Sequence, residues 1–172
     1  MRYQDKGKAV MRTRKIVLCG LLTALAIVLS YIDHLIPLSV SVPGVKIGLA
    51  NIAIVFVLYK LGGRDACIVS LVRIIVVGFT FGSVFGMIYS MSGAVLSLAV
   101  MLLLYHLNCF SPIGVSVAGG VSHNVGQIIA AICIMETKGL VYYLPVLCIS
   151  GILAGICVGV VAGILTKRIK KI

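Results

Sequence analysis

Four hydrogen-bonding side chains cluster within an otherwise apolar stretch, GGVSHNVGQII at residues 119–129. They are Ser122, His123, Asn124 and Gln127. If the stretch is helical, His123 and Gln127 share a face at spacing i, i+4, and Asn124 lies on the same side, three residues before Gln127. Imidazole and amide groups that point inward together can bind a polar ligand. The alternative is hydrogen bonding between helices, which stabilises by about 1 kcal/mol or less per bond.

Arg73 is the second feature with chemical potential, because it places a positive charge inside a long apolar stretch. A charged side chain at the centre of a bilayer costs at least ~2.5 kcal/mol and by default marks a functional site. We expect no acidic residue at its depth, since Asp65 lies at the inner surface and Asp33 and Glu136 lie toward the outer one. An unpaired cation there predicts an anionic ligand group or a ring of acceptors. The alternatives are that Arg73 snorkels, or that it bonds carbonyl groups and locks the bundle.

A third group of polar residues lies in VPGVKIGLANI, at residues 42–52. Lys46 stands at the mouth of the second apolar segment, and Asn51 lies roughly 7 Å deeper. Lys46 predicts attraction of an anionic ligand that enters from outside. The alternative is that Lys46 anchors the helix at the lipid headgroups.

The composition places all of these residues in a membrane protein. Hydrophobic residues make up 61% of the 172 residues and charged residues 11%, and the mean hydropathy is +1.21. A soluble domain is nearer half apolar and one quarter charged. We therefore predict an all-α integral membrane protein, whose net charge of +11 reflects topology and contact with anionic lipids and not nucleic-acid binding.

Six segments are long enough to cross a bilayer, at about 20 residues each. They run over residues 16–36, 47–60, 66–82, 84–105, 113–134 and 143–166. Glycine and phenylalanine continue through VGFTFGSVFG, between the third and fourth segments, so five segments is the alternative. The expected organisation is a basic N-terminal segment over residues 1–15, a six-helix transmembrane domain over 16–166 and a basic tail over 167–172.

The basic residues support six crossings with both termini in the cytoplasm. With six crossings, twelve basic residues fall on one side of the membrane, and the loops on the opposite side carry only Lys46 and Lys138. The twelve are Arg2, Lys6, Lys8, Arg12, Arg14, Lys15, Lys60, Arg64, Lys167, Arg168, Lys170 and Lys171. Because basic loops mark the cytoplasmic side, we predict that this side faces the cytoplasm.

Counting depth along the helices brings the polar residues to one level. A helix rises about 1.5 Å per residue. Arg73 follows Asp65 by eight residues, which places it roughly 12 Å into the membrane. His123 follows Ile113 by ten residues, which places it roughly 15 Å in. Ser92, counted from the opposite end of its segment, reaches a similar depth, so three segments are predicted to bring polar groups near the midplane.

Small residues recur every four positions in the last segment, a spacing that lets another helix approach closely. They are Gly151, Gly155, Gly159 and Gly163. We expect this face to pack against another helix of the same chain. Gly20 and Ala24 have the same spacing in the first segment, and their partner is either a helix of this chain or another protein.

Three motifs together resemble the bacterial membrane family called Gx transporters, also labelled heptaprenyl diphosphate synthase component I. The motifs are KIGLANI at 46–52, SGAVLS at 92–97 and GGVSHNVGQ at 119–127, and the resemblance covers the chain from about residue 12. This family is similar to the S components of energy-coupling factor (ECF) vitamin transporters, which are six-helix substrate-binding proteins open to the outside. In S components, small residues four apart on the first helix meet the transmembrane coupling subunit. Gly20 and Ala24 match that position, although alanine is more usual at both places.

The synthase label is not supported by the acidic residues of the chain. Prenyl diphosphate synthases bind magnesium diphosphate through aspartate-rich motifs, because hard cations need several carboxylates held together. This chain has four acidic residues, no two of them adjacent. We therefore expect no catalysis by this chain alone, and an accessory role in the synthase is the alternative.

These observations predict a membrane-embedded subunit that binds an anionic or strongly polar small molecule, of vitamin or cofactor type, for an ECF uptake transporter. Ligand contacts are expected from Lys46, Asn51, Arg73, Ser92, His123, Asn124 and Gln127. The chain shows no nucleotide-binding motif and no evident proton-relay carboxylate within the membrane. We therefore expect a separate coupling subunit with ATPases, in the bacterial cytoplasmic membrane, and no cofactor, metal or nucleic acid. The alternative is a non-catalytic component of heptaprenyl diphosphate synthase in isoprenoid-quinone synthesis.

Overall fold

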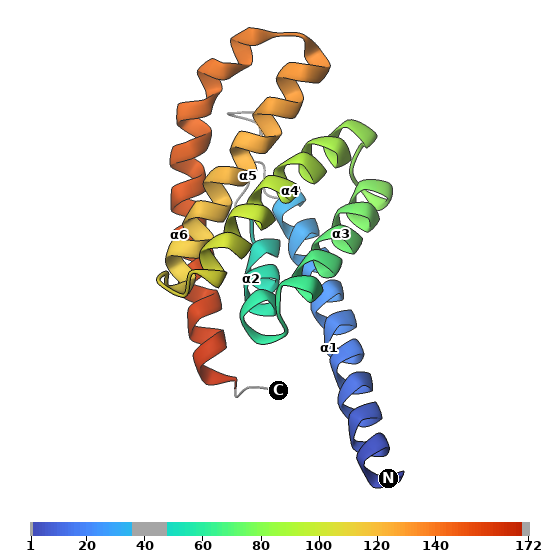
Figure 1. The fold of residues 1–172 in the computed structure, drawn as a ribbon. Coiled ribbons are helices and arrows are strands. Elements are labelled where there is room, and N and C mark those ends of the chain that lie inside the picture. The colour runs from blue at the N-terminus through green and yellow to red at the C-terminus, as the bar shows by residue number, and fades with distance from the viewer. Residues whose placement is uncertain (1, 36–47, 170–172) are drawn as a thin grey trace.

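Six α-helices form the fold in the computed structural model, which describes residues 2–35 and 48–169, with side chains from residue 11 onward (Figure 1). They are α1 (Arg2–Leu35), α2 (Ala50–Lys60), α3 (Gly63–Thr80), α4 (Val84–His106), α5 (Pro112–Met135) and α6 (Leu144–Arg168). A short 3-10 helix, η2 (Lys138–Tyr143), leads from α5 into α6. The predicted all-helical fold is confirmed for these residues, and Lys46 lies outside them.

Capping serines mark where two of the helices begin. α3 ends at Thr80, and the side chain of Ser83 accepts a hydrogen bond from the N–H of Gly86 at 3.0 Å at the start of α4. Ser111 accepts in the same way from Gly114 at 3.3 Å at the start of α5. A cap of this kind satisfies an amide that no helical carbonyl reaches. The third and fourth apolar segments are therefore two helices, not one.

Within residues 2–35 and 48–169, four helical segments are long and apolar enough to cross a membrane, which makes the chain a multi-pass membrane protein. They are Met11–Leu35, Val84–His106, Pro112–Met135 and Lys138–Arg168. α2 has only 11 residues and spans roughly 16 Å, about half of the hydrocarbon core. α3 carries Arg64, Asp65 and Arg73 among its 18 residues. Six crossings with both termini in the cytoplasm therefore stay a prediction.

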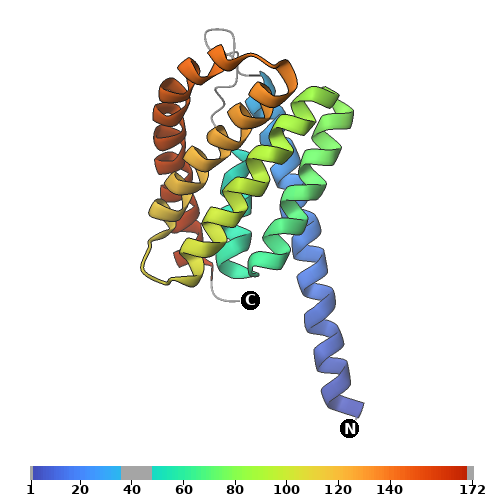
Figure 2. The ribbon, with the colours of Figure 1, turned by 45° about the horizontal axis from the view of Figure 1, so that its top comes forward.

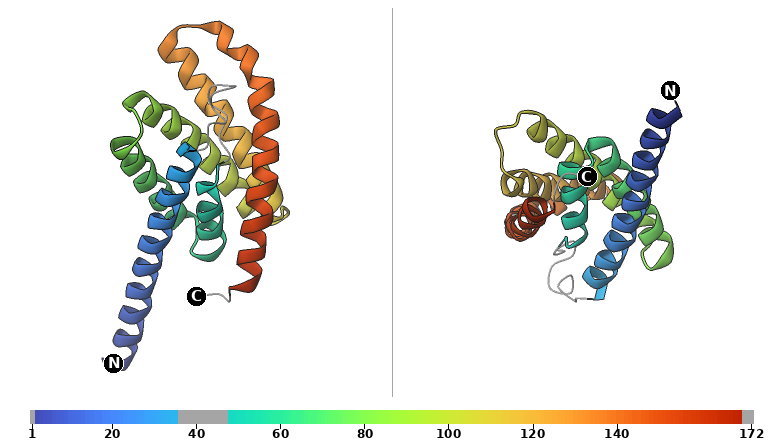
Figure 3. Two further views of the ribbon diagram at one scale, coloured as in Figure 1. Left: turned by 180° about the vertical axis from the view of Figure 1, so that it is seen from behind. Right: turned by 90° about the horizontal axis from the view of Figure 1, so that it is seen from below.

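Two central helices organise the bundle. α5 packs between α4 and α6, whereas α2 contacts α1, α3 and α6 (Figures 1 and 2). Seen from behind, α2 lies between α1 and α6 (Figure 3). The apolar core follows α2, where Val55, Val57 and Leu58 are buried, and it continues to Val69 of α3 and Val115 of α5. The short helix α2 is therefore enclosed by its neighbours.

Glycines bring α6 to within backbone distance of α5. A Cβ atom on Gly155 would lie 2.6 Å from the Cα of Val117, and one on Gly159 would lie 2.5 Å from the Cα of Ile113. At Gly163 the nearest atom would be an ordinary 3.9 Å away. The prediction that the glycine face of the last segment packs within the chain is confirmed.

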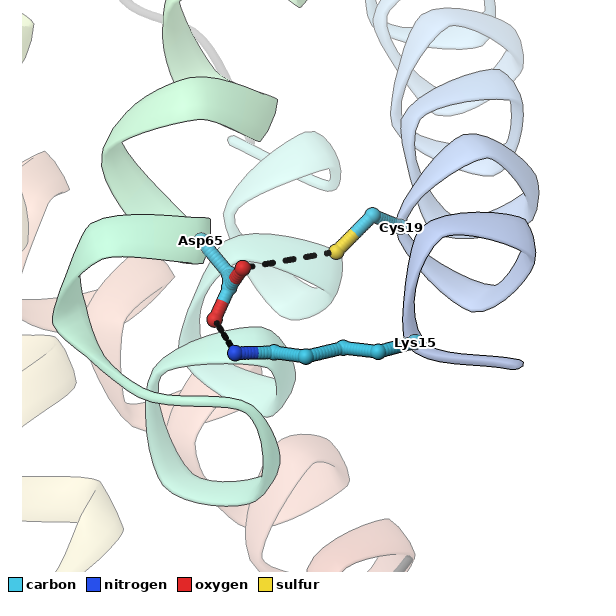
Figure 4. A network of polar contacts seen from close by, with 3 residues as sticks. All are labelled: Lys15, Cys19 and Asp65. Atoms are coloured by element: carbon cyan, nitrogen blue, oxygen red, sulfur yellow. Dashed lines mark hydrogen bonds and ion pairs between the residues drawn. The ribbon is translucent and has the colours of Figure 1, made fainter. Parts of the chain in front are cut away.

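Polar contacts join α1 to α3 and α2 to α6 at one end of the bundle. Lys15 Nζ lies 2.7 Å from one carboxylate oxygen of Asp65, and Cys19 Sγ donates to the other at 3.8 Å (Figure 4). Lys60 donates to the backbone carbonyl of Ile169, which follows α6. We call this end, which holds Lys15, Lys60 and Asp65, the basic end. It is the end that the sequence analysis assigns to the cytoplasm.

Substituting Gly155 by alanine tests the close packing of α6 on α5. The added methyl group would meet the backbone of Val117, and such overpacking costs about 1–3 kcal/mol. We expect the melting temperature of the protein in detergent to fall by roughly 3–10 °C. Gly163→Ala on the same helix is the control: its methyl group has room, so its melting temperature should stay at or slightly above that of the wild type. Equal melting temperatures for the two variants would contradict the packing.

Candidate functional site

A cavity of about 80 Å³ lies inside the bundle, and residues from all six α-helices line it. A space of this size holds a few water molecules or one small polar group. Its polar lining residues are Asp33, Asn51, Arg73, Ser90, Ser97, Ser116, His123, Asn124 and Gln127. The cavity therefore joins charged and amide side chains inside an apolar bundle.

Five of the seven predicted ligand-binding residues line this cavity. They are Asn51, Arg73, His123, Asn124 and Gln127. The three α5 residues face it together, as their helical spacing indicates. Ser92 is not among the lining residues, and its hydroxyl group donates to the carbonyl oxygen of Ile88 within α4 at 2.9 Å. Lys46 lies outside the described part of the chain.

Ser90 and Ser97 stand in the α4 wall of the cavity, and the sequence analysis missed both. They are two helical turns apart and share a face, whereas Ser92 is rotated by about 200° from Ser90. Gly93 marks the side of α4 that touches α5, since a Cβ atom there would lie 2.7 Å from the carbonyl oxygen of His123. Depth alone selected Ser92. The small pair Gly93 and Ser97, four residues apart, was the signal for the facing side.

Arg73 bonds a residue of α1, and its surroundings correct the expectation that no acidic residue lies at its depth. Its Nη1 donates to Ser30 Oγ at 3.3 Å, and Asp33 lines the same cavity as Arg73. Asp33 also accepts from the backbone N–H of Leu49 at 2.8 Å, just before α2. The expectation of no acidic residue at the depth of Arg73 is therefore wrong. Counting along separate helices ignored the reach of the arginine side chain and the packing of α1 on α3.

Two buried polar atoms in the cavity wall have hydrogen-bonding capacity to spare. Arg73 Nε and Ser116 Oγ are both buried, and neither has a hydrogen-bond partner in the part of the chain that the structure describes. A buried polar group left unsatisfied costs about 1–3 kcal/mol. Such atoms beside a cavity attract water or the polar groups of a ligand. The wall can therefore bind a group that accepts hydrogen bonds.

Asn124 also joins two helices. Its Nδ2 donates to the carbonyl oxygen of Leu147 on α6 at 2.6 Å. Gly120 of α5 and Gly151 of α6 allow the two helices to come this close. A Cβ atom on Gly151 would lie 2.9 Å from Asn124 Nδ2 and 3.0 Å from the carbonyl oxygen of Gly120. Interhelical bonding, the alternative interpretation of the polar stretch, is thus observed for Asn124.

Gly20 and Ala24 lie on a side of α1 that the described residues leave uncovered. A Cβ atom on Gly20 would have nothing within 4 Å, and Ala24 is exposed. Leu21 and Val28 beside them are exposed by 66% and 54%. This face of α1 is open to lipid or to a partner helix.

The chain belongs to the family described as heptaprenyl diphosphate synthase component I, whose model matches residues 22–165. The family resemblance that rests on the three sequence motifs is confirmed. The family description names one component of a synthase. Searches of curated proteins and of solved structures found no match. The similarity to ECF S components stays a prediction.

Alanine substitutions at two α5 positions separate packing from cavity lining. Asn124→Ala removes the hydrogen bond to Leu147, and bonds of this kind contribute about 0.6–1.7 kcal/mol. We expect the melting temperature in detergent to fall by roughly 2–5 °C. Gln127→Ala is the comparison, because its side chain lines the cavity, and its melting temperature should stay close to that of the wild type. A larger fall for Gln127→Ala than for Asn124→Ala would contradict this assignment.

Proposed function

We propose that this chain is the membrane-embedded substrate-binding subunit of an ECF-type uptake transporter. One observation carries the proposal: Asn51, Arg73 and the polar residues of α5 converge on a single cavity in an apolar bundle. Ionisable groups inside membrane segments are costly, and they usually face a ligand, an ion path or one another. Family membership and the four apolar spans are compatible with this role.

The cavity wall favours an anionic or strongly polar ligand of vitamin or cofactor type. Arg73 offers its buried Nε, and Ser116 and the α5 side chains add neutral hydrogen-bonding groups. Because Asp33 lines the same cavity, its negative charge works against the binding of an anionic group. Sites for drug-sized molecules usually enclose 300–1,000 Å³, so a cavity of about 80 Å³ receives only the polar part of the ligand.

The energy for transport would come from a separate coupling subunit with ATPases. Gly20 and Ala24 form a smooth, uncovered strip on α1, and small residues four apart allow a second helix to approach closely. The basic end would face the cytoplasm, in the bacterial plasma membrane, because basic residues are retained on that side. Both termini would then lie in the cytoplasm.

The family description supports a second candidate function, a non-catalytic membrane component of heptaprenyl diphosphate synthase. In that role the chain would hold a synthase at the membrane. The polar cavity would then stabilise the bundle and would contain no exchangeable ligand. Retention of a small molecule by the purified chain therefore separates the two functions.

Ligand retention is tested by native mass spectrometry of the protein purified from cells grown in rich medium. We expect a bound small molecule on the wild type, and weaker retention by Arg73→Gln and Gln127→Ala. Hydrogen bonds to a charged group contribute about 1.5–3 kcal/mol and neutral ones about 0.5–1.5 kcal/mol. Affinity should therefore fall roughly tenfold or more for Arg73→Gln and roughly three- to tenfold for Gln127→Ala.

Ser122→Ala is the matched control for Gln127→Ala. Ser122 lies on the same helix, but its hydroxyl group bonds the carbonyl oxygen of Ala118 at 2.7 Å, and it is not among the cavity-lining residues. Its ligand retention should equal that of the wild type. A wild-type protein that retains no small molecule and copurifies with a prenyl diphosphate synthase would favour the second function.

The uncovered face of α1 is tested with Gly20→Leu in cells that co-express the ECF coupling subunit and ATPases. The leucine has room within this chain, so the variant should fold while its recovery of the coupling subunit in a pull-down falls at least several-fold. Ala99→Leu adds similar bulk at an exposed position of α4 and should leave recovery unchanged. Equal recovery by both variants would count against this face as the contact.

A further inference from the structure

A second cavity, of about 100 Å³, shares Arg73 with the first. It is lined by the end of α1, the second half of α3 and the start of α4. Asp33, Arg73 and Ser90 line both cavities. The guanidinium and its neighbours therefore form the boundary between two adjoining chambers.

The wall of the second chamber differs in chemistry from that of the first. Its apolar side chains are Ile74, Val77, Phe81 and Met87, and beside the shared Asp33, Arg73 and Ser90 it is also lined by Ser30 and His34. The ring of Phe81 packs against two residues of α1. Its centroid lies 5.3 Å from that of Tyr31, in an edge-on arrangement, and 6.0 Å from that of His34. The amide-bearing α5 does not contribute to this chamber. The first chamber thus holds the amide groups, whereas the second has the larger apolar share of its wall.

Glycines in the stretch VGFTFGSVFG leave the space of the second chamber open. Gly78, Gly82 and Gly86 all line it. A Cβ atom on Gly82 would lie 3.0 Å from the Cα of Gly78, a tight contact with backbone that a side chain would have to push aside. One on Gly78 would lie 2.9 Å from the Cβ of Met87, where α3 and α4 meet. The glycines that made the boundary between the third and fourth apolar segments hard to predict therefore line this chamber.

We propose that the two chambers bind one amphiphilic ligand, with an anionic group at Arg73, polar contacts to α5 and a short apolar segment in the second chamber. The inference rests on the proposed function, since it assumes that the first cavity holds the polar part of a ligand. A guanidinium shared by an amide-bearing chamber and a more apolar one suits a molecule whose charge lies between, or next to, two unlike parts. The second chamber then contributes affinity by removing apolar surface from water.

A series of n-alkyl phosphates tests the inference on the full chain in lipid nanodiscs. Methyl, butyl and hexyl phosphate carry the same anionic group, and their binding is measured by competition with the copurified ligand or by calorimetry. Affinity should rise with chain length, by up to about fourfold for each methylene group that becomes buried. Hexanol, which lacks the anionic group, controls for partition into the lipid and should not compete.

Val77→Phe narrows the second chamber, whereas Ile75→Phe adds a ring on the same helix at a position 40% exposed and outside the lining. We expect Val77→Phe to abolish the gain from methyl to hexyl phosphate and to leave methyl phosphate binding within about twofold. Ile75→Phe should keep the full gain. Met87→Ala, which widens the chamber, provides a second test should Val77→Phe fail to fold, and it should shift the preference toward longer chains.

Two outcomes would overturn the inference. If methyl phosphate binds in an Arg73-dependent way and longer chains bind no more tightly, the second chamber holds no part of the ligand and the proposed function still stands. If the length dependence is identical in Val77→Phe and Ile75→Phe, the gain comes from lipid partition and not from the chamber. If the wild type retains no small molecule in the mass spectrometry experiment, that result would instead count against the proposed function itself.

Discussion

The approach of α5 to its neighbours at backbone distance is the constraint on which the rest of the structure depends. Gly93 on α4 and Gly155 on α6 have no side chain to hold α5 away. Apolar surface drives no association between helices in lipid, so small residues and interhelical hydrogen bonds must supply it. With α5 packed between α4 and α6, its polar residues His123, Asn124 and Gln127 face the interior of the bundle and line the cavity. The cavity is a consequence of that packing.

Arg73 is the second organising element, because a buried guanidinium needs compensation wherever it is placed. Ser30 of α1 supplies part of it as an acceptor, and Asp33 of α1, in the same cavity wall, accepts from the N–H of Leu49 just before α2. Arg73 therefore joins α3 to α1 at the point where two chambers meet.

The fold was largely predictable, and the site only in part. Helix-length apolar segments and serine caps are local features, so the all-helical fold and the extent of α5 along the chain follow from short stretches of sequence. The cavity wall on α4 does not, because Ser90 and Ser97 share a face and Ser92 lies on another, and which face turns toward α5 depends on where Gly93 touches it. The place of Asp33 was missed for the same reason: it lines the same two cavities as Arg73 only because α1 packs on α3.

The sequence by itself determined that this chain is a helical, multi-pass membrane protein with a polar stretch on one helix and a single arginine within an apolar segment. These properties follow from composition and from periodicity within single helices, where each residue's neighbours are three or four positions away. Only the tertiary structure decided which side chains share a cavity, that Asp33 stands by Arg73, and that a second chamber adjoins the first. Those relations join residues far apart in the chain, and they are set by contacts between helices that no local pattern encodes.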